Sequence, residues 1–185
     1  METVLILDFG AQYSQLIARR VREQNVYCEV KPCSISPAEI KKIAPIGIIL
    51  SGGPQSVYES VSLHVDPALF ALGIPVLGIC YGCQLMAYSL GGTVAAATEA
   101  TAREYGKTPT EFDSDCAIFQ GLPASSVTWM SHGDYISQVP DGFTVTAKTA
   151  VCPTAAMACP EKKLYGVQFH PEVESTPKGT DILRN

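Results

Sequence analysis

The sequence predicts an α/β protein with an open, mostly parallel sheet flanked by helices and additional antiparallel β segments in the second half. Two observations lead to this prediction. In residues 1–92, short apolar runs alternate with segments of helical periodicity. Strands that are apolar along their whole length are typical of parallel sheets whose connecting helices cover both faces. From Thr93 onward, shorter β segments follow one another without such helices between them.

Four strands are expected in the first half of the chain. Each is a short run of apolar and β-branched residues that is bounded by polar residues, glycine or proline. These runs lie at 3–8, 26–31, 46–50 and 75–79. Continuous runs of this kind, joined by helices, indicate a parallel sheet that is covered on both faces.

A helix is expected after each of these strands. At 13–24 the apolar residues share one helical face and the arginines lie elsewhere. A Ser-Pro-Ala-Glu capping box at 36–39 opens a short helix through Ile43. Two further helices are expected, one from an Asp66-Pro67 cap to a stop at Gly73 and one at 81–90.

The second half contains four more expected strands, at 126–130, 143–148, 154–159 and 164–169. No internal repeat, low-complexity tract or linker interrupts the sequence. We therefore expect residues 1–185 to form one domain, a size at which a single core is usual.

Composition and charge exclude several classes of function. The formal net charge is −5 at pH 7, and a broad basic surface for nucleic acid is not expected. The N-terminus lacks the basic segment of a signal peptide, and no apolar run approaches the roughly 18 residues of a membrane span. Seven scattered cysteines in such a chain are typical of free thiols, so we expect a cytoplasmic protein without a membrane partner.

Four polar or glycine-rich clusters directly follow predicted strands. They are "SGGP" after Leu50, Cys80 after Ile79, "SHGD" after Met130 and "HPE" after Phe169. Ligands of open parallel sheets bind beyond the carboxyl ends of the strands. We therefore expect these clusters to converge at one edge of the sheet and to form a site there.

Cys80 lies in "GICYG", which has the form of a nucleophile elbow. Gly78 and Gly82 permit a sharp turn from strand to helix, which would hold Cys80 in a disfavoured backbone conformation at a helix N-terminus. The dipole and free amides at that end stabilise a thiolate. Cys83 completes a C-x-x-C spacing. This segment alone is as compatible with a buried structural cysteine as with a nucleophile, and a redox pair is the weaker third interpretation.

His170 and Glu172 lie two positions apart, so their side chains point the same way in an extended backbone. A carboxylate beside a histidine holds its tautomer and supports the imidazolium that forms when it accepts a thiol proton. On its own the segment is more often a turn with an ion pair than a catalytic pair. Together with Cys80 on a neighbouring strand end, it favours nucleophilic catalysis.

The "SGGP" segment at 51–54 predicts an oxyanion hole, formed by the amides of Gly53 and Tyr81. The segment lacks the Lys-Ser/Thr tail of a nucleotide-binding loop, which disfavours phosphate binding. No metal site is predicted, because Cys80 and Cys83 have no further ligands at suitable spacing.

These motifs resemble the class I glutamine amidotransferases, which carry a Cys-His-Glu triad on a flavodoxin-like fold. The resemblance covers essentially all 185 residues. It is closest to the glutaminase domains of the GMP synthase branch, and it is carried by the segments "LILDFGAQYSQLIARRVRE", "SGGPQSVYE", "GICYGCQLMA", "REYG", "TWMSHGD" and "GVQFHPEV". The resemblance implies Cys80 as nucleophile, His170 as general base and acid, and Glu172 as the residue that orients His170. It further implies that the substrate is bound by Gly52, Gln84, Ser131 and His132, and that Arg103, Glu104 and Tyr105 face a partner domain.

The implied reaction is glutamine hydrolysis to glutamate and ammonia. A separate ATP-pyrophosphatase (synthetase) domain, normally fused C-terminally, would use the ammonia with ATP and Mg to aminate XMP to GMP. That domain and the family's dimerisation domain are expected to lie outside this sequence, which ends within what reads as the first turns of a helix. No cofactor is expected in this chain.

Cys83 departs from the family pattern, where a larger apolar residue is common, and is interpreted as a bystander. Two alternatives remain open at this point. One is the glutaminase of another class I amidotransferase, of the anthranilate, CTP or carbamoyl-phosphate type. The other is a non-catalytic flavodoxin-like binding module.

Overall fold

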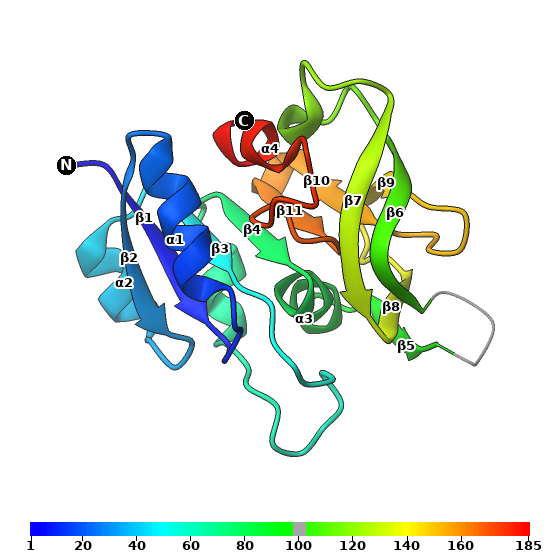
Figure 1. Cartoon of the computed structure of the whole chain (residues 1–185). Coiled ribbons are helices and arrows are strands. Elements are labelled where there is room, and N and C mark those ends of the chain that lie inside the picture. The colour runs from blue at the N-terminus through cyan, green and yellow to red at the C-terminus, as the bar shows by residue number, and fades with distance from the viewer. Residues whose placement is uncertain (98–102) are drawn as a thin grey trace.

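A computed structural model describes residues 1–97 and 103–185 and confirms the predicted α/β architecture (Figure 1). A nine-stranded sheet has the order β2-β1-β3-β4-β11-β10-β9-β6-β7, and a small second sheet pairs β5 with β8. The strands are β1 (Thr3–Asp8), β2 (Tyr27–Pro32), β3 (Gly47–Leu50), β4 (Val76–Ile79), β5 (Thr93–Ala96), β6 (Glu104–Phe112), β7 (Ser125–His132), β8 (Asp134–Gln138), β9 (Thr144–Lys148), β10 (Ala156–Cys159) and β11 (Leu164–Val167). The helices are α1 (Ser14–Glu23), α2 (Pro37–Ile43), α3 (Tyr81–Ser89) and α4 (Gly179–Arg184), with 3-10 turns η1 (Pro67–Ala71), η2 (Ala117–Phe119) and η3 (Pro160–Lys162).

The large sheet is parallel on one side and antiparallel on the other. Strands β2, β1, β3, β4 and β11 are paired in parallel, whereas β10, β9, β6 and β7 are joined by antiparallel pairing. The strand that links the two parts is β11, which comes from the second half of the sequence but pairs with β4. This pairing brings the segment after β11 next to the segment after β4.

The two faces of the sheet carry separate cores. Residues of β1 alternate between them: Leu5 and Leu7 pack with α2 and α3, and Ile6 packs with α1 and α4. In Figure 1, α1 lies in front of the sheet and α2 lies behind it. The predicted coverage of the parallel strands on both faces is therefore confirmed.

The helix signals of the first half act as expected, with one correction. The Ser36 side chain accepts from the Glu39 amide and the Glu39 carboxylate accepts from the Ser36 amide, which completes the capping box of α2. Asp66 also caps its segment, because its side chain accepts from the Ala68 amide. The segment that follows is the five-residue 3-10 turn η1 and not the expected α-helix. Too few residues separate Pro67 from the turn at Gly73 for α-helical hydrogen bonds to propagate.

The sequence analysis did not predict three of the strands: β5, β6 and β8. The longest is β6, "EYGKTPTEF", which is polar along one face and contains Pro109. Proline is tolerated there because β6 pairs with β9 only through Glu111 and Phe112, so the backbone at Pro109 has a partner strand on one side alone.

Two predicted strand ends also differ from the structure. Strand β7 continues through His132, so Ser131 and His132 end this strand, and Asp134 already begins β8. Strand β11 ends at Val167, and Gln168 and Phe169 already belong to the turn that leads to His170. Both differences lie at the carboxyl end of a strand, where the boundary depends on the pairing with neighbouring strands.

All seven cysteines are buried and free in the structure. None of the helices in residues 1–97 and 103–185 has the length and apolar character that a membrane crossing requires.

Candidate active site

A cavity of about 540 Å³ opens at the carboxyl ends of the parallel strands, where the sequence placed the site. Its walls come from the loops after β1, β3 and β4, from β7 and from the segment after β11. All but one of the residues that were predicted to form the site line this cavity: Gly52, Gly53, Cys80, Tyr81, Gln84, Ser131, His132 and His170. The remaining one, Glu172, lies behind His170. The predicted convergence of four segments is therefore observed.

Cys80 occupies the strained turn between β4 and α3. Its backbone angles are φ 52° and ψ −108°, and it is the N-cap residue of α3. The turn depends on its glycines: a Cβ atom at Gly78 would lie 2.6 Å from the carbonyl oxygen of Gly82, and one at Gly82 would lie 2.5 Å from the carbonyl oxygen of Leu50. This is the elbow geometry expected from "GICYG".

We expect Gly82→Ala to destabilise the protein strongly, because the added methyl group would collide with the backbone of β3. Overpacking of this kind typically costs about 1–3 kcal/mol, which corresponds to a fall in Tm of roughly 2–12 °C for a chain of this size. Thermal unfolding checks this, with Gly47→Ala as the matched control, because its nearest atom would be 3.8 Å away. Equal Tm values for the two variants would contradict the close approach of α3 to β3.

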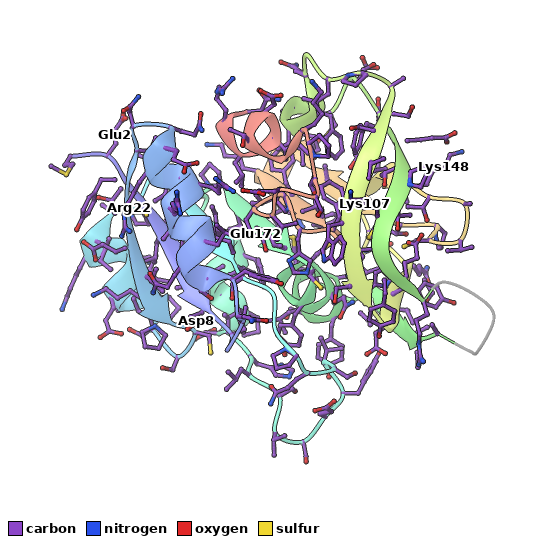
Figure 2. All side chains as sticks on the ribbon, in the orientation of Figure 1. Glu2, Asp8, Arg22, Lys107, Lys148 and Glu172 are labelled. Carbon is purple, nitrogen blue, oxygen red and sulfur yellow. The ribbon has the colours of Figure 1, made fainter. Side chains whose placement is uncertain are left out.

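His170 and Glu172 form a buried pair. The Nδ1 atom of His170 lies 2.7 Å from Oε1 of Glu172, and the Glu172 side chain is 1% exposed. Figure 2 shows Glu172 between α1 and the β6–β7 hairpin. Arg20 donates to the backbone carbonyl of Glu172, and the Thr176 hydroxyl donates to that of His170 at 2.7 Å. The turn after β11 is thus held from both sides.

His170 and Cys80 face each other across Gly52. A Cβ atom at Gly52 would lie 3.2 Å from Cε1 of His170 and 3.6 Å from Cβ of Cys80, so a side chain at this position would crowd the imidazole. Burial alone would lower the pKa of His170, but hydrogen bonds to Cys80 and Glu172 and their negative charges outweigh it and raise the pKa from 6.5 to about 10. The imidazole is therefore charged at neutral pH when it lies beside the sulfur.

Gly53 lies against Tyr81, the residue that follows Cys80, and both line the cavity. A Cβ atom at Gly53 would lie 3.0 Å from the carbonyl oxygen of Phe9 and 3.4 Å from Cγ of Tyr81, so the loop passes close to both residues. Among the described residues, neither the Gly53 amide nor the Tyr81 amide has a hydrogen-bond acceptor. Two free donors therefore border the cavity next to the cysteine.

Gln84 lines the cavity, but its side-chain nitrogen has protein partners. It lies 3.0 Å from the carbonyl oxygen of Asp134 and 3.1 Å from Oε1 of Gln168. Sequence reasoning missed Gln168, which is fully buried and whose Nε2 lies 3.6 Å from the Cys80 sulfur. A signal was available: Gln168 is the polar residue in the apolar run "LYGVQF" and lies two positions before His170.

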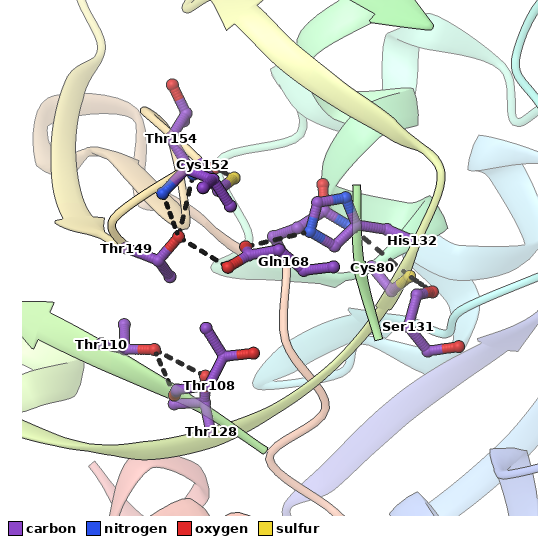
Figure 3. A network of polar contacts seen from close by, with 12 residues as sticks. Cys80, Thr108, Thr110, Thr128, Ser131, His132, Thr149, Cys152, Thr154 and Gln168 are labelled. Carbon is purple, nitrogen blue, oxygen red and sulfur yellow. Dashed lines mark hydrogen bonds and ion pairs between the residues drawn. The ribbon is translucent and has the colours of Figure 1, made fainter. Parts of the chain in front are cut away.

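His132 is supported by a second buried network, drawn in Figure 3. Its Nδ1 lies 2.8 Å from the carbonyl oxygen of Asp134, and its Nε2 lies 3.4 Å from Oε1 of Glu104. Thr149 donates to the other oxygen of Glu104 at 2.8 Å. Glu104 therefore points inward, which corrects the expectation that it faces a partner domain; its neighbour Tyr105 is exposed and lines the cavity mouth.

One group of potential metal ligands exists in the part of the chain that the structure describes: Glu104, His132 and Cys152, with ligand atoms within 4.8 Å of one another. Burial and the nearby Glu104 charge raise the pKa of Cys152 to about 12, so its thiol stays protonated at neutral pH. The Glu104 oxygens and the His132 ring already have hydrogen-bond partners. The network is therefore complete without an ion.

Cys83 is fully buried on the far side of the elbow helix. A Cβ atom at Gly166 would lie 2.5 Å from its sulfur, so the thiol packs directly against β11. Burial, with added repulsion from Cys80 and Cys152, raises the pKa of Cys83 well above its usual value. Only the thiolate form attacks disulfides and electrophiles, so these surroundings favour a structural role for Cys83 over a redox pair.

Comparisons with known proteins place this geometry in context. The family model for class I glutamine amidotransferases matches residues 5–185. Curated relatives include the GMP synthase (glutamine-hydrolyzing) of Caldanaerobacter subterraneus, 58% identical over 184 residues, and that of Clostridium botulinum strain Alaska E43, 55% identical over 184 residues. Each match covers all of this chain but only 35% of the relative, so the chain spans about a third of their length.

Solved structures agree in fold. A candidate GMP synthase subunit of Thermoplasma acidophilum superposes with a TM-score of 0.85 at 32% identity, covering all of this chain and 91% of that one. A glutamine amidotransferase of Thermotoga maritima superposes with a TM-score of 0.72 at 25% identity, covering 93% of this chain and 76% of that one.

Proposed function

Because the chain belongs to the class I glutamine amidotransferase family, we propose that it hydrolyses glutamine to glutamate and ammonia through Cys80, His170 and Glu172. One observation carries this proposal. A cysteine in a strained elbow at a helix N-terminus faces, across a glycine, a histidine that a buried carboxylate braces at 2.7 Å. This order of side chains is the one that covalent catalysis by a nucleophile, a proton carrier and an orienting group requires, and it supports the proposal.

The first half of the reaction forms a thioester. The Cys80 thiolate attacks the side-chain amide carbon of glutamine, and the developing oxyanion accepts hydrogen bonds from the Gly53 and Tyr81 amides. The charged His170 then gives its proton to the departing nitrogen, and ammonia leaves with the electron pair of the broken C–N bond. The raised pKa of His170 supports this order, because the proton is already in place before the attack.

The second half regenerates the enzyme. Neutral His170 takes a proton from water, the hydroxide attacks the thioester carbon, and the C–S bond breaks to release glutamate and the Cys80 thiolate. Glu172 holds the His170 ring through Nδ1 in both halves, so the other ring nitrogen stays directed at the reacting atoms. Ser131, His132, Gly52 and Gln84 line the cavity in which the substrate would lie.

The ammonia has a proposed destination. The names of the curated relatives support the assignment of this chain to the glutaminase part of a GMP synthase. We propose that residues 1–185 form one glutamine amidotransferase domain, and that a synthetase domain, fused C-terminally in the whole protein, uses the ammonia with ATP and Mg to aminate XMP. The free, buried cysteines of this chain support a cytoplasmic location. Another class I amidotransferase would use the same site and differ only in the acceptor.

Two assays test the proposal. The purified chain should release glutamate and ammonia in equal amounts from glutamine, and a synthetase domain from the Caldanaerobacter relative should couple this release to GMP formation from XMP and ATP. Asparagine, one methylene shorter, serves as the matched substrate control. Glutamine hydrolysis without ammonia transfer to XMP would assign the chain to another branch of the family, and no hydrolysis in either setting would refute the glutaminase assignment.

A further inference from the structure

Gln168 is the side chain in contact with the Cys80 sulfur that the reaction described above does not use. It follows β11 directly, is fully buried, and its Nε2 lies 3.6 Å from Sγ of Cys80. Figure 3 shows Gln168 and Ser131 on either side of the Cys80 side chain. A buried polar group is costly unless its hydrogen bonds are made, so the partners of the Gln168 amide determine which of its ends faces the sulfur.

A backbone carbonyl fixes that orientation. The side-chain nitrogen of Gln84 lies 3.0 Å from the carbonyl oxygen of Asp134, which can only accept. Gln84 must therefore place its NH₂ group there, and the same nitrogen lies 3.1 Å from the amide of Gln168. Gln168 must present its oxygen to this donor, which turns its own NH₂ group toward the sulfur. The direction of both amides thus follows from the protein backbone.

The Cys80 sulfur has two polar neighbours, one that favours its thiol form and one that favours its thiolate form. The carbonyl oxygen of Ser131, at 3.7 Å, can accept from the S–H group of the thiol. The NH₂ group of Gln168 can only donate, so it interacts best with the thiolate. Hydrogen bonds to a charged acceptor are roughly twice as strong as neutral ones, and burial strengthens them further.

We propose that Gln168 is a further catalytic residue, which donates a hydrogen bond to the Cys80 thiolate, and that Gln84 is a positioning residue, which holds Gln168 in the donating orientation. This inference rests on the proposed role of Cys80 as nucleophile. The hydrogen bond acts before the attack on glutamine and again when the sulfur departs from the thioester carbon with the electron pair of the broken bond. Gln84 then serves the nucleophile as well as the substrate cavity.

The test is the pH dependence of Cys80 alkylation by iodoacetamide, followed at Cys80 by mass spectrometry. Gln168→Met keeps an unbranched side chain of similar size but has no donor. We expect alkylation near neutral pH to slow about ten- to a hundredfold, the midpoint of the pH profile to move upward, and kcat for glutamine to fall similarly. Gln138→Met, on the exposed face of β8, is the matched control and should change nothing.

Gln84→Met supplies a second, independent variant. Without its donor to fix Gln168, the amide can turn, so we expect a smaller upward shift of the same midpoint. If folded Gln168→Met and Gln84→Met both keep the wild-type midpoint, the inference is wrong, even if kcat falls through altered packing. A wild-type protein that hydrolyses no glutamine would instead refute the proposed function, so the two failures are distinguishable.

Discussion

Replacing Cys80 by alanine should abolish glutamine hydrolysis, with a loss of up to about a million-fold if the behaviour of other catalytic triads applies. The reason is chemical: without the sulfur no thioester forms, and only the oxyanion donors and the cavity remain to assist direct attack by water. The measurement is glutamate release under saturating glutamine. Alanine can adopt the backbone conformation of Cys80 as cysteine does and is small enough for this buried position, so the variant should remain folded.

Cys83→Ala is the matched control for this variant. It also removes a cysteine sulfur, three residues further along the chain, but from a fully buried position that does not line the cavity. We expect it to lower the free energy of unfolding through lost packing and to retain glutamine hydrolysis. Equal losses of activity in both variants would restore the redox interpretation of the C-x-x-C spacing.

His170→Asn should reduce activity by a comparable factor, on the order of a million-fold, because triad residues act as a unit. Asparagine can still bond to Glu172 but cannot carry a proton to the leaving nitrogen. In the double variant with Cys80→Ala, the loss should be no larger than in either single variant. Additive losses would show that the two residues act independently, which would contradict the proposed mechanism.

The same variant has a signature in stability. The pKa of His170 is raised from 6.5 to about 10, so the stability that its charge contributes is fully present below about pH 6.5 and is lost as pH rises through about 10. The difference in free energy of unfolding between wild type and His170→Asn should therefore shrink across this range. Urea unfolding at pH 6, 8 and 10 measures it, and a difference that grows with pH would contradict the charged pair.

The sequence anticipated the parallel part of the fold because its signals there are local. The capping box at Ser36 and the elbow glycines around Cys80 each act within a few residues, and the structure contains both. The antiparallel part was harder to predict. Strand β6 has no apolar periodicity and contains Pro109, so its existence depends on pairing with β7, a contact between segments that the sequence pattern does not link.

The residues of the site likewise divide into those with a local sequence signal and those whose position depends on long-range contacts. Motif spacing led to Cys80, His170 and Glu172, whose positions depend on strand ends that a parallel sheet aligns. The supporting residues could not be found in this way. Glu104 reaches His132 from another strand, and Gln168 is oriented by Gln84 from another element. Such hydrogen bonds depend on the register between β4 and β11 and between β6 and β7, which only the folded structure fixes.

The proposed chemistry depends on a single reactive sulfur, that of Cys80, at the N-terminus of α3. Its most direct test is the mass of the intact chain after incubation with an electrophilic glutamine analogue, such as a chloroketone, followed by peptide mapping. We predict one adduct, located on Cys80, that excess glutamine suppresses and that His170→Asn slows. An adduct on any other cysteine, or none under conditions in which glutamine is hydrolysed, would contradict the assignment of Cys80 as the nucleophile.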